Sequence, residues 1–375
     1  MLFKDIIGQN ELKAKLIQTV KEGRISHAQF FLGKSGYSTL PLAVAYAQYV
    51  CCENKDEDDS CGVCPSCHKY QKLIHPDLHF VFPVNSTKSI SSDKKPISDY
   101  FINDWRQLLS TNPYFTEQDW YETIGIDNKQ GNISANEADR IISKLNLKPY
   151  EAEYKVMIIW LPERLNVTSA NRLLKLIEEP PTNTLFLLVS ENSGQVLKTI
   201  YSRTQLIKLP PIEEPEIVKA LLGKGIPDKD AHAAARLAQG NYRQAMQILA
   251  NRDSENEYFS AFVMLMRYSY SNDVITLLEW AEDMAGWGRE RQKAFLSYAE
   301  SILRENFMLN LKIEDTVYLG FNEYDWAQKF APFINQKNVY ELYKQFNHCI
   351  GHIGQNGNAK IIFSDLVLKT VKLIN

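Results

Sequence analysis

The sequence of 375 residues lacks the features that place a chain in a membrane or in a secretory pathway. It has no run of about 18 apolar residues, the length that crosses a bilayer. Its first residues, MLFKDIIGQNELK, contain neither an apolar signal core nor a small-residue cleavage pattern. It also lacks excess basic charge, since the formal net charge of −3 argues against a protein that coats nucleic acid over its whole surface. We therefore expect a cytoplasmic protein with no membrane partner.

Cysteine is scarce outside one short stretch. Of six cysteines, five lie between Cys51 and Cys67, and only Cys349 is remote. Disulfides are rare in cytosolic proteins, so clustering of this kind indicates a metal site rather than a disulfide framework.

The spacing within this stretch predicts a zinc site. Two C-x2-C steps bring enough thiolates together to close a tetrahedron, and four sulfur ligands leave no open position, as in structural zinc sites. The predicted ligands are Cys52, Cys61, Cys64 and Cys67. Cys51 is an alternative to Cys52, and His68 and His75 are weaker alternative ligands.

The stretch around which the chain is organised runs from Tyr154 to Pro181. Val156 to Trp160 is an uninterrupted apolar run of the kind that a parallel sheet buries on both faces. A helical pattern follows, and the two prolines at 180 and 181 end it. Similar alternation of strands and helices from residue 1 to about 212 predicts an α/β domain with a parallel sheet between helices.

A glycine loop follows the first predicted strand, but it lacks the residues of a phosphate-binding loop. The pattern G-x-x-x-x-G-K-[ST] supplies backbone amides and a lysine for phosphates and a hydroxyl for magnesium. From Gly33 this chain reads GKSGYSTL, with a glycine at Gly36, and the three required positions are occupied by Ser38, Thr39 and Leu40. Lys34 lies five positions too early, and residual nucleotide binding through it is left open.

The acidic pair that holds magnesium and water at the end of the central strand is also missing. The corresponding positions are Trp160 and Leu161, and an apolar pair cannot hold a cation. We therefore expect that the chain binds no ATP and has no intrinsic ATPase activity.

An aromatic stretch at about 86–131 interrupts the α/β pattern and reads as an insertion. Its aromatic residues include Trp105, Tyr114, Phe115 and Trp120. Such side chains can stack on nucleic-acid bases, but little basic charge surrounds them, so packing within an inserted subdomain is the favoured interpretation. From residue 214 onward the pattern is helical almost throughout.

Several motifs together resemble the delta-prime family of bacterial clamp-loader subunits, AAA+ proteins that have lost their own ATPase activity. They are IGQ (7–9), HAQFFLG (27–33), the four-cysteine module, NRLLKLIEEPP (171–181), SRT (202–204) and GNYR (240–243). The resemblance implies an α/β AAA+ nucleotide-hydrolase-like domain with the zinc module over 1–212, a helical lid domain over 213–250 and an all-helical collar domain for oligomerisation over 251–375. Thr204 stands where the family has cysteine, and the insertion has no family role.

The resemblance also implies roles and partners. Arg203 corresponds to the arginine finger that acts in trans on the ATP of a neighbouring subunit. Arg243 matches a second-sensor arginine, for which a structural role is favoured here. The implied partners are a gamma/tau-type ATPase subunit and a delta-type subunit in a hetero-oligomeric ring of the DNA polymerase III holoenzyme. Sliding clamp and primer–template DNA would be reached through that complex.

Two other functions are consistent with parts of the sequence. An active AAA+ ATPase would bind ATP in isolation through Lys34. A zinc-containing nucleic-acid-binding module would bind DNA in a salt-dependent manner through Trp105 or Trp120.

Overall fold

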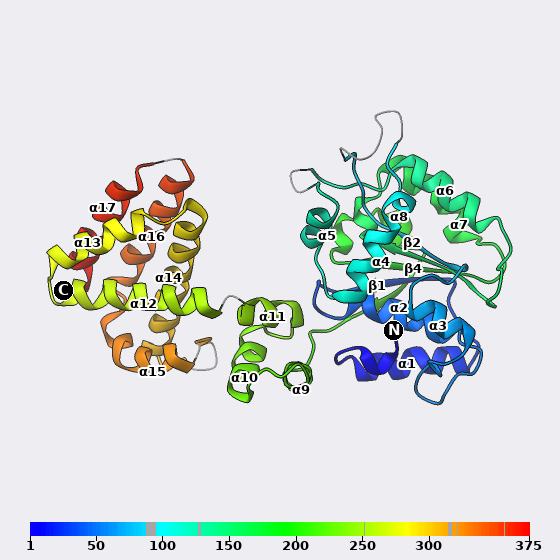
Figure 1. Ribbon diagram of the computed structural model, residues 1–375, viewed down its shortest axis with the longest axis horizontal. Coiled ribbons are helices and arrows are strands. Elements are labelled where there is room, and N and C mark those ends of the chain that lie inside the picture. The colour runs from blue at the N-terminus through cyan, green and yellow to red at the C-terminus, as the bar shows by residue number, and fades with distance from the viewer. Residues whose placement is uncertain (88–94, 127–128, 251, 314–316, 320, 356) are drawn as a thin grey trace. The chain divides into compact units, whose positions relative to one another are not determined.

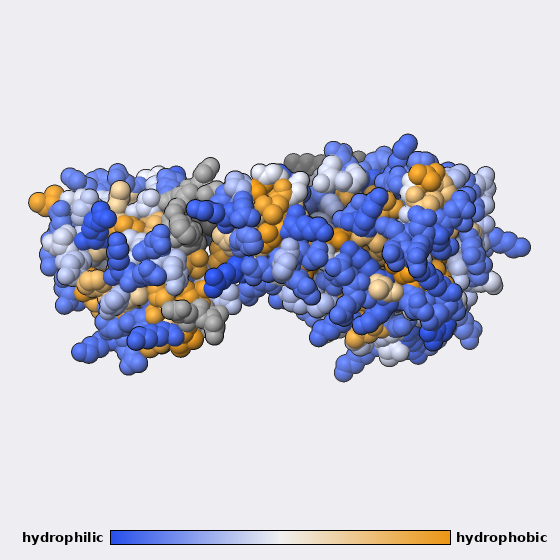
Figure 2. Space-filling view, turned by 90° about the horizontal axis from the view of Figure 1, so that it is seen from below, coloured by the Kyte–Doolittle hydropathy of each residue, from blue (hydrophilic) through white to orange (hydrophobic). Residues whose placement is uncertain are grey.

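The computed structural model describes residues 1–87, 95–126, 129–250, 252–313, 317–319, 321–355 and 357–375. The chain divides into two compact units, Met1–Met246 and Gln247–Asn375. Within the described residues, no helix combines the length and the apolar character needed to cross a bilayer. The face seen in Figure 2 is mainly hydrophilic and exposes hydrophobic residues in separate areas.

A five-stranded parallel sheet forms the centre of the first unit, with the strand order β2-β3-β4-β1-β5. Parallel pairing requires crossover connections, which the intervening helices supply. The strands are β1 (Ala28–Leu32), β2 (Leu78–Val81), β3 (Lys155–Trp160), β4 (Thr184–Ser190) and β5 (Gln205–Lys208).

Helices cover both faces of this sheet (Figure 1). Side chains alternate along β3, so that Val156 and Ile158 belong to one hydrophobic cluster, whereas Met157 and Ile159 belong to the other. All four are fully buried, which explains why the strand reads as a continuous apolar run. The helices around the sheet are α1 (Asn10–Lys21), α2 (Thr39–Val50), α3 (Pro65–Gln71), α6 (Ala135–Leu145), α7 (Val167–Glu178) and α8 (Lys198–Tyr201).

The insertion is part of the hydrophobic core. It contains α4 (Ile102–Thr111) and α5 (Glu117–Thr123), and residues 88–94 and 127–128 of the predicted range lie outside the described residues. Trp105 and Trp120 are completely buried, and Trp105 stacks on Phe82 with ring centroids 4.2 Å apart. The aromatic side chains therefore pack inside the protein, as the favoured interpretation predicts, and are not displayed for base stacking.

Three helices follow the sheet: α9 (Glu214–Gly223), α10 (Asp228–Leu237) and α11 (Tyr242–Ala250). We call them the three-helix segment. The second unit is helical, with a hydrophobic cluster of its own. Its helices are α12 (Arg252–Tyr270), α13 (Val274–Ala285), α14 (Arg289–Asn310), α15 (Phe321–Phe330), α16 (Val339–Gly354) and α17 (Ala359–Ile374).

Candidate functional site: a four-cysteine centre, a filled glycine-loop pocket and an exposed arginine

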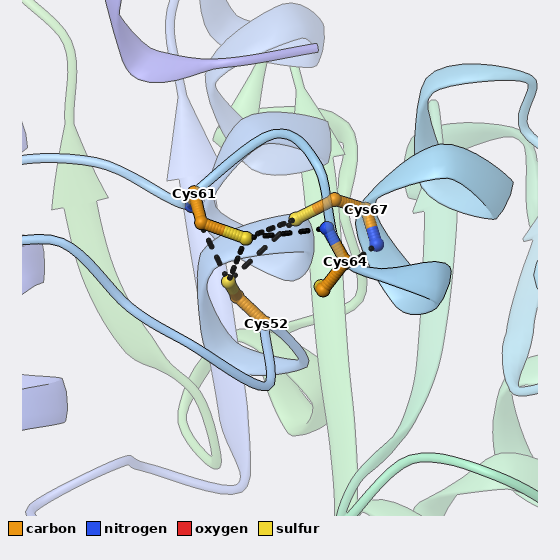
Figure 3. A group of neighbouring side chains, drawn as sticks. All are labelled: Cys52, Cys61, Cys64 and Cys67. Carbon is orange, nitrogen blue, oxygen red and sulfur yellow. Dashed lines mark hydrogen bonds between the residues drawn. The ribbon is translucent and has the colours of Figure 1, made fainter.

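Four cysteines converge between α2 and the start of α3 (Figure 3). Their sulfur atoms lie within 4.8 Å of one another, and Cys52 Sγ is 3.6 Å from the sulfurs of both Cys61 and Cys67. Four sulfurs bound to one zinc at about 2.3 Å lie about 3.8 Å apart, so this spacing fits a tetrahedral ion. The cluster comprises Cys52, Cys61, Cys64 and Cys67 and could bind a metal such as zinc.

Backbone amides favour the thiolate form of Cys61, whereas burial raises the pKa of the Cys52 and Cys67 thiols in the absence of a metal. The N–H groups of Cys61, Cys64 and Cys67 donate to the sulfurs of Cys52, Cys61 and Cys64, each over 3.4 Å. Backbone donors, that of Val63 foremost, lower the pKa of the Cys61 thiol to about 7. Hydrogen bonds of this kind favour the charged form, which is the form that binds metal.

Cys51 is not part of the cluster. Its sulfur donates to the carbonyl of Tyr154 over 3.5 Å, and burial raises the pKa of its thiol to about 12. Of the two adjacent cysteines, Cys52 therefore provides the fourth sulfur.

The glycine loop has a left-handed residue at the position of the second glycine of a phosphate-binding loop. Ser38, where that loop has its second glycine, has φ of 71°, in the left-handed region that glycine favours. Thr39 then begins α2. The Ser38 hydroxyl donates to the carbonyl of Ile7 over 2.9 Å, so it is engaged within the protein.

The space beside this loop is filled by the insertion. Its walls include Gly33, Gly36 and Thr39 from the loop and Tyr114 and Phe115 from the insertion, and about 20 Å³ remains. This volume is enough for about one water molecule. It is far below the roughly 300–1,000 Å³ of pockets that hold small ligands.

Trp160 lines this pocket, and Leu161 is buried in the same hydrophobic cluster, so neither provides a cation site. They are 3% and 2% exposed, and the Trp160 ring lies 5.1 Å from that of Phe115. Leu40, at the position of the magnesium-binding hydroxyl, also lines the pocket and is buried. Lys34 is exposed and is not among the residues that line the pocket.

Arg203 lies elsewhere, at the surface between α8 and β5. Its Nε pairs with the carboxylate of Glu178 at the end of α7, and its Nη1 donates to the carbonyl of Thr199 over 2.9 Å. The side chain is 37% exposed and borders an open cavity of about 440 Å³ that His27 and Ile177 also line.

Arg203 and the glycine loop lie at opposite ends of β1. His27, which borders the cavity beside Arg203, precedes the strand, whereas Gly33 follows it. Six residues of extended chain span about 20 Å. Arg203 is therefore too far from the glycine loop of its own chain to contact a phosphate held there.

Comparison with known proteins identifies the family. A family model described as "DNA polymerase III, delta subunit" matches residues 8–213, which hold the sheet and the cysteine cluster. The "DNA polymerase III subunit delta'" of Haemophilus influenzae is 31% identical over 201 residues, 53% of this chain and 48% of that protein. The protein of the same name from Bacillus subtilis is 26% identical over 249 residues, covering 64% of this chain and 60% of that one.

The chain belongs to the DNA polymerase III delta-prime subunit family. The match spans about half the length of the Haemophilus relative. A tau/gamma subunit of Haemophilus influenzae is also similar, at 24% identity over 74% of this chain and 35% of that protein. The predicted family is confirmed, and so is the predicted α/β fold with a parallel sheet, a four-cysteine cluster and C-terminal helices.

In this delta-prime family chain, the sequence did not reveal what occupies the degenerate pocket. Phe115 and Trp160 are 45 positions apart, and no local pattern couples them. The available signal was the aromatic content of the insertion beside an apolar residue at the acid position.

Proposed function

We propose that this chain is the non-hydrolysing subunit of a cytoplasmic DNA polymerase III clamp loader and supplies Arg203 to the ATP of a neighbouring subunit. The observation that carries the proposal is the position of Arg203, which is exposed at the end of β1 opposite the chain's own glycine loop. An arginine in that position can contact only a nucleotide that is bound to another subunit.

The pairing of Arg203 with Glu178 is compatible with such a role. Both side chains are about two-fifths exposed, at 37% and 43%. Exposed ion pairs contribute about 0–1 kcal/mol, so an incoming phosphate can replace Glu178 at little cost. The planar guanidinium then donates to the phosphate oxygens as negative charge develops on them.

The pocket beside the chain's own glycine loop has the properties expected in a subunit that does not bind or hydrolyse nucleotide. Thr39 and Leu161 replace the lysine and one of the acids, and the insertion fills the space. ATP in the neighbouring site would join the two subunits, so that its binding biases the assembly toward the state that opens the sliding clamp. The partners are a gamma/tau-type ATPase and a delta-type subunit, with clamp and primer–template DNA reached through the complex.

We further propose that the four-cysteine cluster holds one structural zinc ion. The four thiolates complete the coordination shell, so the ion has no open position for chemistry. Its role is to fix the loop between α2 and α3. Asp59 in that loop accepts hydrogen bonds from the backbone N–H groups of Phe3 and Lys4 over 3.0 Å each, so a fixed loop also positions the first residues of the chain.

The proposal is tested by reconstitution. Gamma/tau-type and delta-type subunits are mixed with or without this chain, and ATP hydrolysis is measured with the clamp and primed DNA. We expect the DNA-stimulated rate only in the complete mixture. Equal rates in both mixtures, with the chain incorporated by native mass spectrometry, would contradict the proposal.

A further inference from the structure

The insertion touches more than the glycine loop. The Tyr114 hydroxyl oxygen accepts a hydrogen bond from the backbone N–H of Ile7 over 3.1 Å, and its ring lies 4.9 Å from that of Tyr242 at the start of α11. Tyr114 and Tyr242 are 7% and 3% exposed. The residue that helps to fill the pocket therefore also packs against the three-helix segment.

An ion pair strengthens this junction. Arg243 Nη2 donates to Asp119 Oδ1 over 2.6 Å, and each side chain is only about a quarter exposed. The other oxygen, Asp119 Oδ2, accepts from the backbone N–H and the hydroxyl of Thr116 and caps α5. One carboxylate thus fixes the start of α5 and binds the arginine at the same time.

The three-helix segment also contacts the glycine loop directly. The Tyr242 N–H donates to the Gly36 carbonyl over 3.1 Å, and Asn241 Nδ2 donates to the Ser35 carbonyl over 2.9 Å. A Cβ atom at Gly36 would lie 1.9 Å from Asn241 Oδ1 and 3.1 Å from Arg243 Cβ. The glycine therefore permits the close approach of Asn241 and of the Arg243 Cβ to the loop, while the Arg243 guanidinium reaches Asp119 on the insertion.

Backbone amides of a glycine loop and a nearby guanidinium are the groups that attract a phosphate. Here the guanidinium is neutralised by Asp119, and the space is occupied by Tyr114 and Phe115. We infer that the segment 113–119 is a built-in ligand of the degenerate nucleotide site, which holds the three-helix segment on the α/β domain whether or not ATP is present. This inference concerns the first unit alone and does not depend on the role of Arg203.

Hydrogen exchange of the full-length chain tests the inference. Arg243→Met keeps an unbranched apolar stem at this position and removes the ion pair. We expect the amides of Tyr242 and Ile212, which bond to the carbonyls of Gly36 and Gly240, to exchange about 10-fold faster, because a hydrogen bond to a charged group is lost. Arg236→Met on α10 is the matched control, since Arg236 is an exposed arginine of the same segment, and should leave these rates unchanged.

Asp119→Asn and Tyr114→Phe keep the test decisive if Arg243→Met does not fold. Asp119→Asn retains an oxygen for the α5 cap and removes the charge, and the double variant Asp119→Asn/Arg243→Met should exchange no faster than the faster single variant. Tyr114→Phe keeps the ring on Tyr242 and should speed exchange of the Ile7 amide about 3-fold.

Three results would overturn the inference. They are wild-type exchange rates in Arg243→Met, additive effects in the double variant, and slower exchange of the three-helix segment when millimolar Mg-ATP is added to the wild-type chain. None of these measurements involves ATP hydrolysis, so their outcome is separate from that of the reconstitution experiment.

Discussion

Replacing Arg203 with alanine is expected to lower DNA-stimulated ATP hydrolysis by the reconstituted assembly severalfold, while the assembly remains intact. An arginine finger stabilises the charge on the transferring phosphoryl group and contributes about 10³–10⁵ in rate at the site it serves. Any ATP site that this chain does not serve would be unaffected, so we expect the total rate to fall much less than the rate at the one affected site.

Two variants identify the cause of such a fall. Arg203→Lys keeps the positive charge but loses the planar fork, so we expect it to recover only part of the rate. Arg172→Ala is the matched control, because Arg172 is 41% exposed and paired with Asp139, yet does not border the cavity beside Arg203. Full activity of Arg203→Ala in an assembly of unchanged mass would make Arg203 an ordinary interface residue.

Replacing Cys67, one of the four proposed zinc ligands, is expected to give the largest loss of stability. Structural zinc binds to small domains with an apparent free energy of about 10–16 kcal/mol, and this energy contributes directly to folding. Cys67 is completely buried, so a serine there leaves three thiolates and an incomplete shell. We expect elemental analysis to find one zinc per wild-type chain and much less in Cys67→Ser, with a lower melting temperature of the first unit.

Cys51→Ser is the control for this experiment. Cys51 is adjacent to a predicted ligand and equally buried, but its sulfur bonds to the Tyr154 carbonyl and not to the cluster. The variant should keep its zinc. Freshly purified, reduced wild-type protein that contains no metal would refute the assignment.

The sheet could be predicted from the sequence because its strands are buried on both faces. Val156 to Trp160 and Leu185 to Val189 are continuous apolar runs, and both form strands in the structure. The cysteine cluster could also be predicted from the sequence, because its residues are close in the sequence and C-x2-C spacing restricts their geometry. The choice between Cys51 and Cys52 needed the structure, since adjacent residues differ only in side-chain direction.

The contents of the nucleotide site could not be predicted in the same way. Asp119 and Arg243 are 124 positions apart, and each has an unremarkable local sequence. A substitution such as Trp160 for an acid indicates that a cation is no longer held, but it does not say which distant segment takes the space. Periodicity and spacing likewise gave no indication of a role for Arg203. Only the resemblance to the delta-prime family distinguished it from other exposed arginines.

We expect that this chain has no nucleotide chemistry of its own, and titration of the isolated protein with Mg-ATP in a calorimeter tests this expectation most directly. Because the pocket is filled and the lysine is missing, we expect no saturable binding of ATP up to about 1 mM. A Kd of about 1 mM corresponds to a binding free energy of only about −4 kcal/mol. Saturable binding with micromolar affinity, abolished by Lys34→Ala, would contradict the expectation that this chain has no nucleotide chemistry and would indicate an active ATPase subunit.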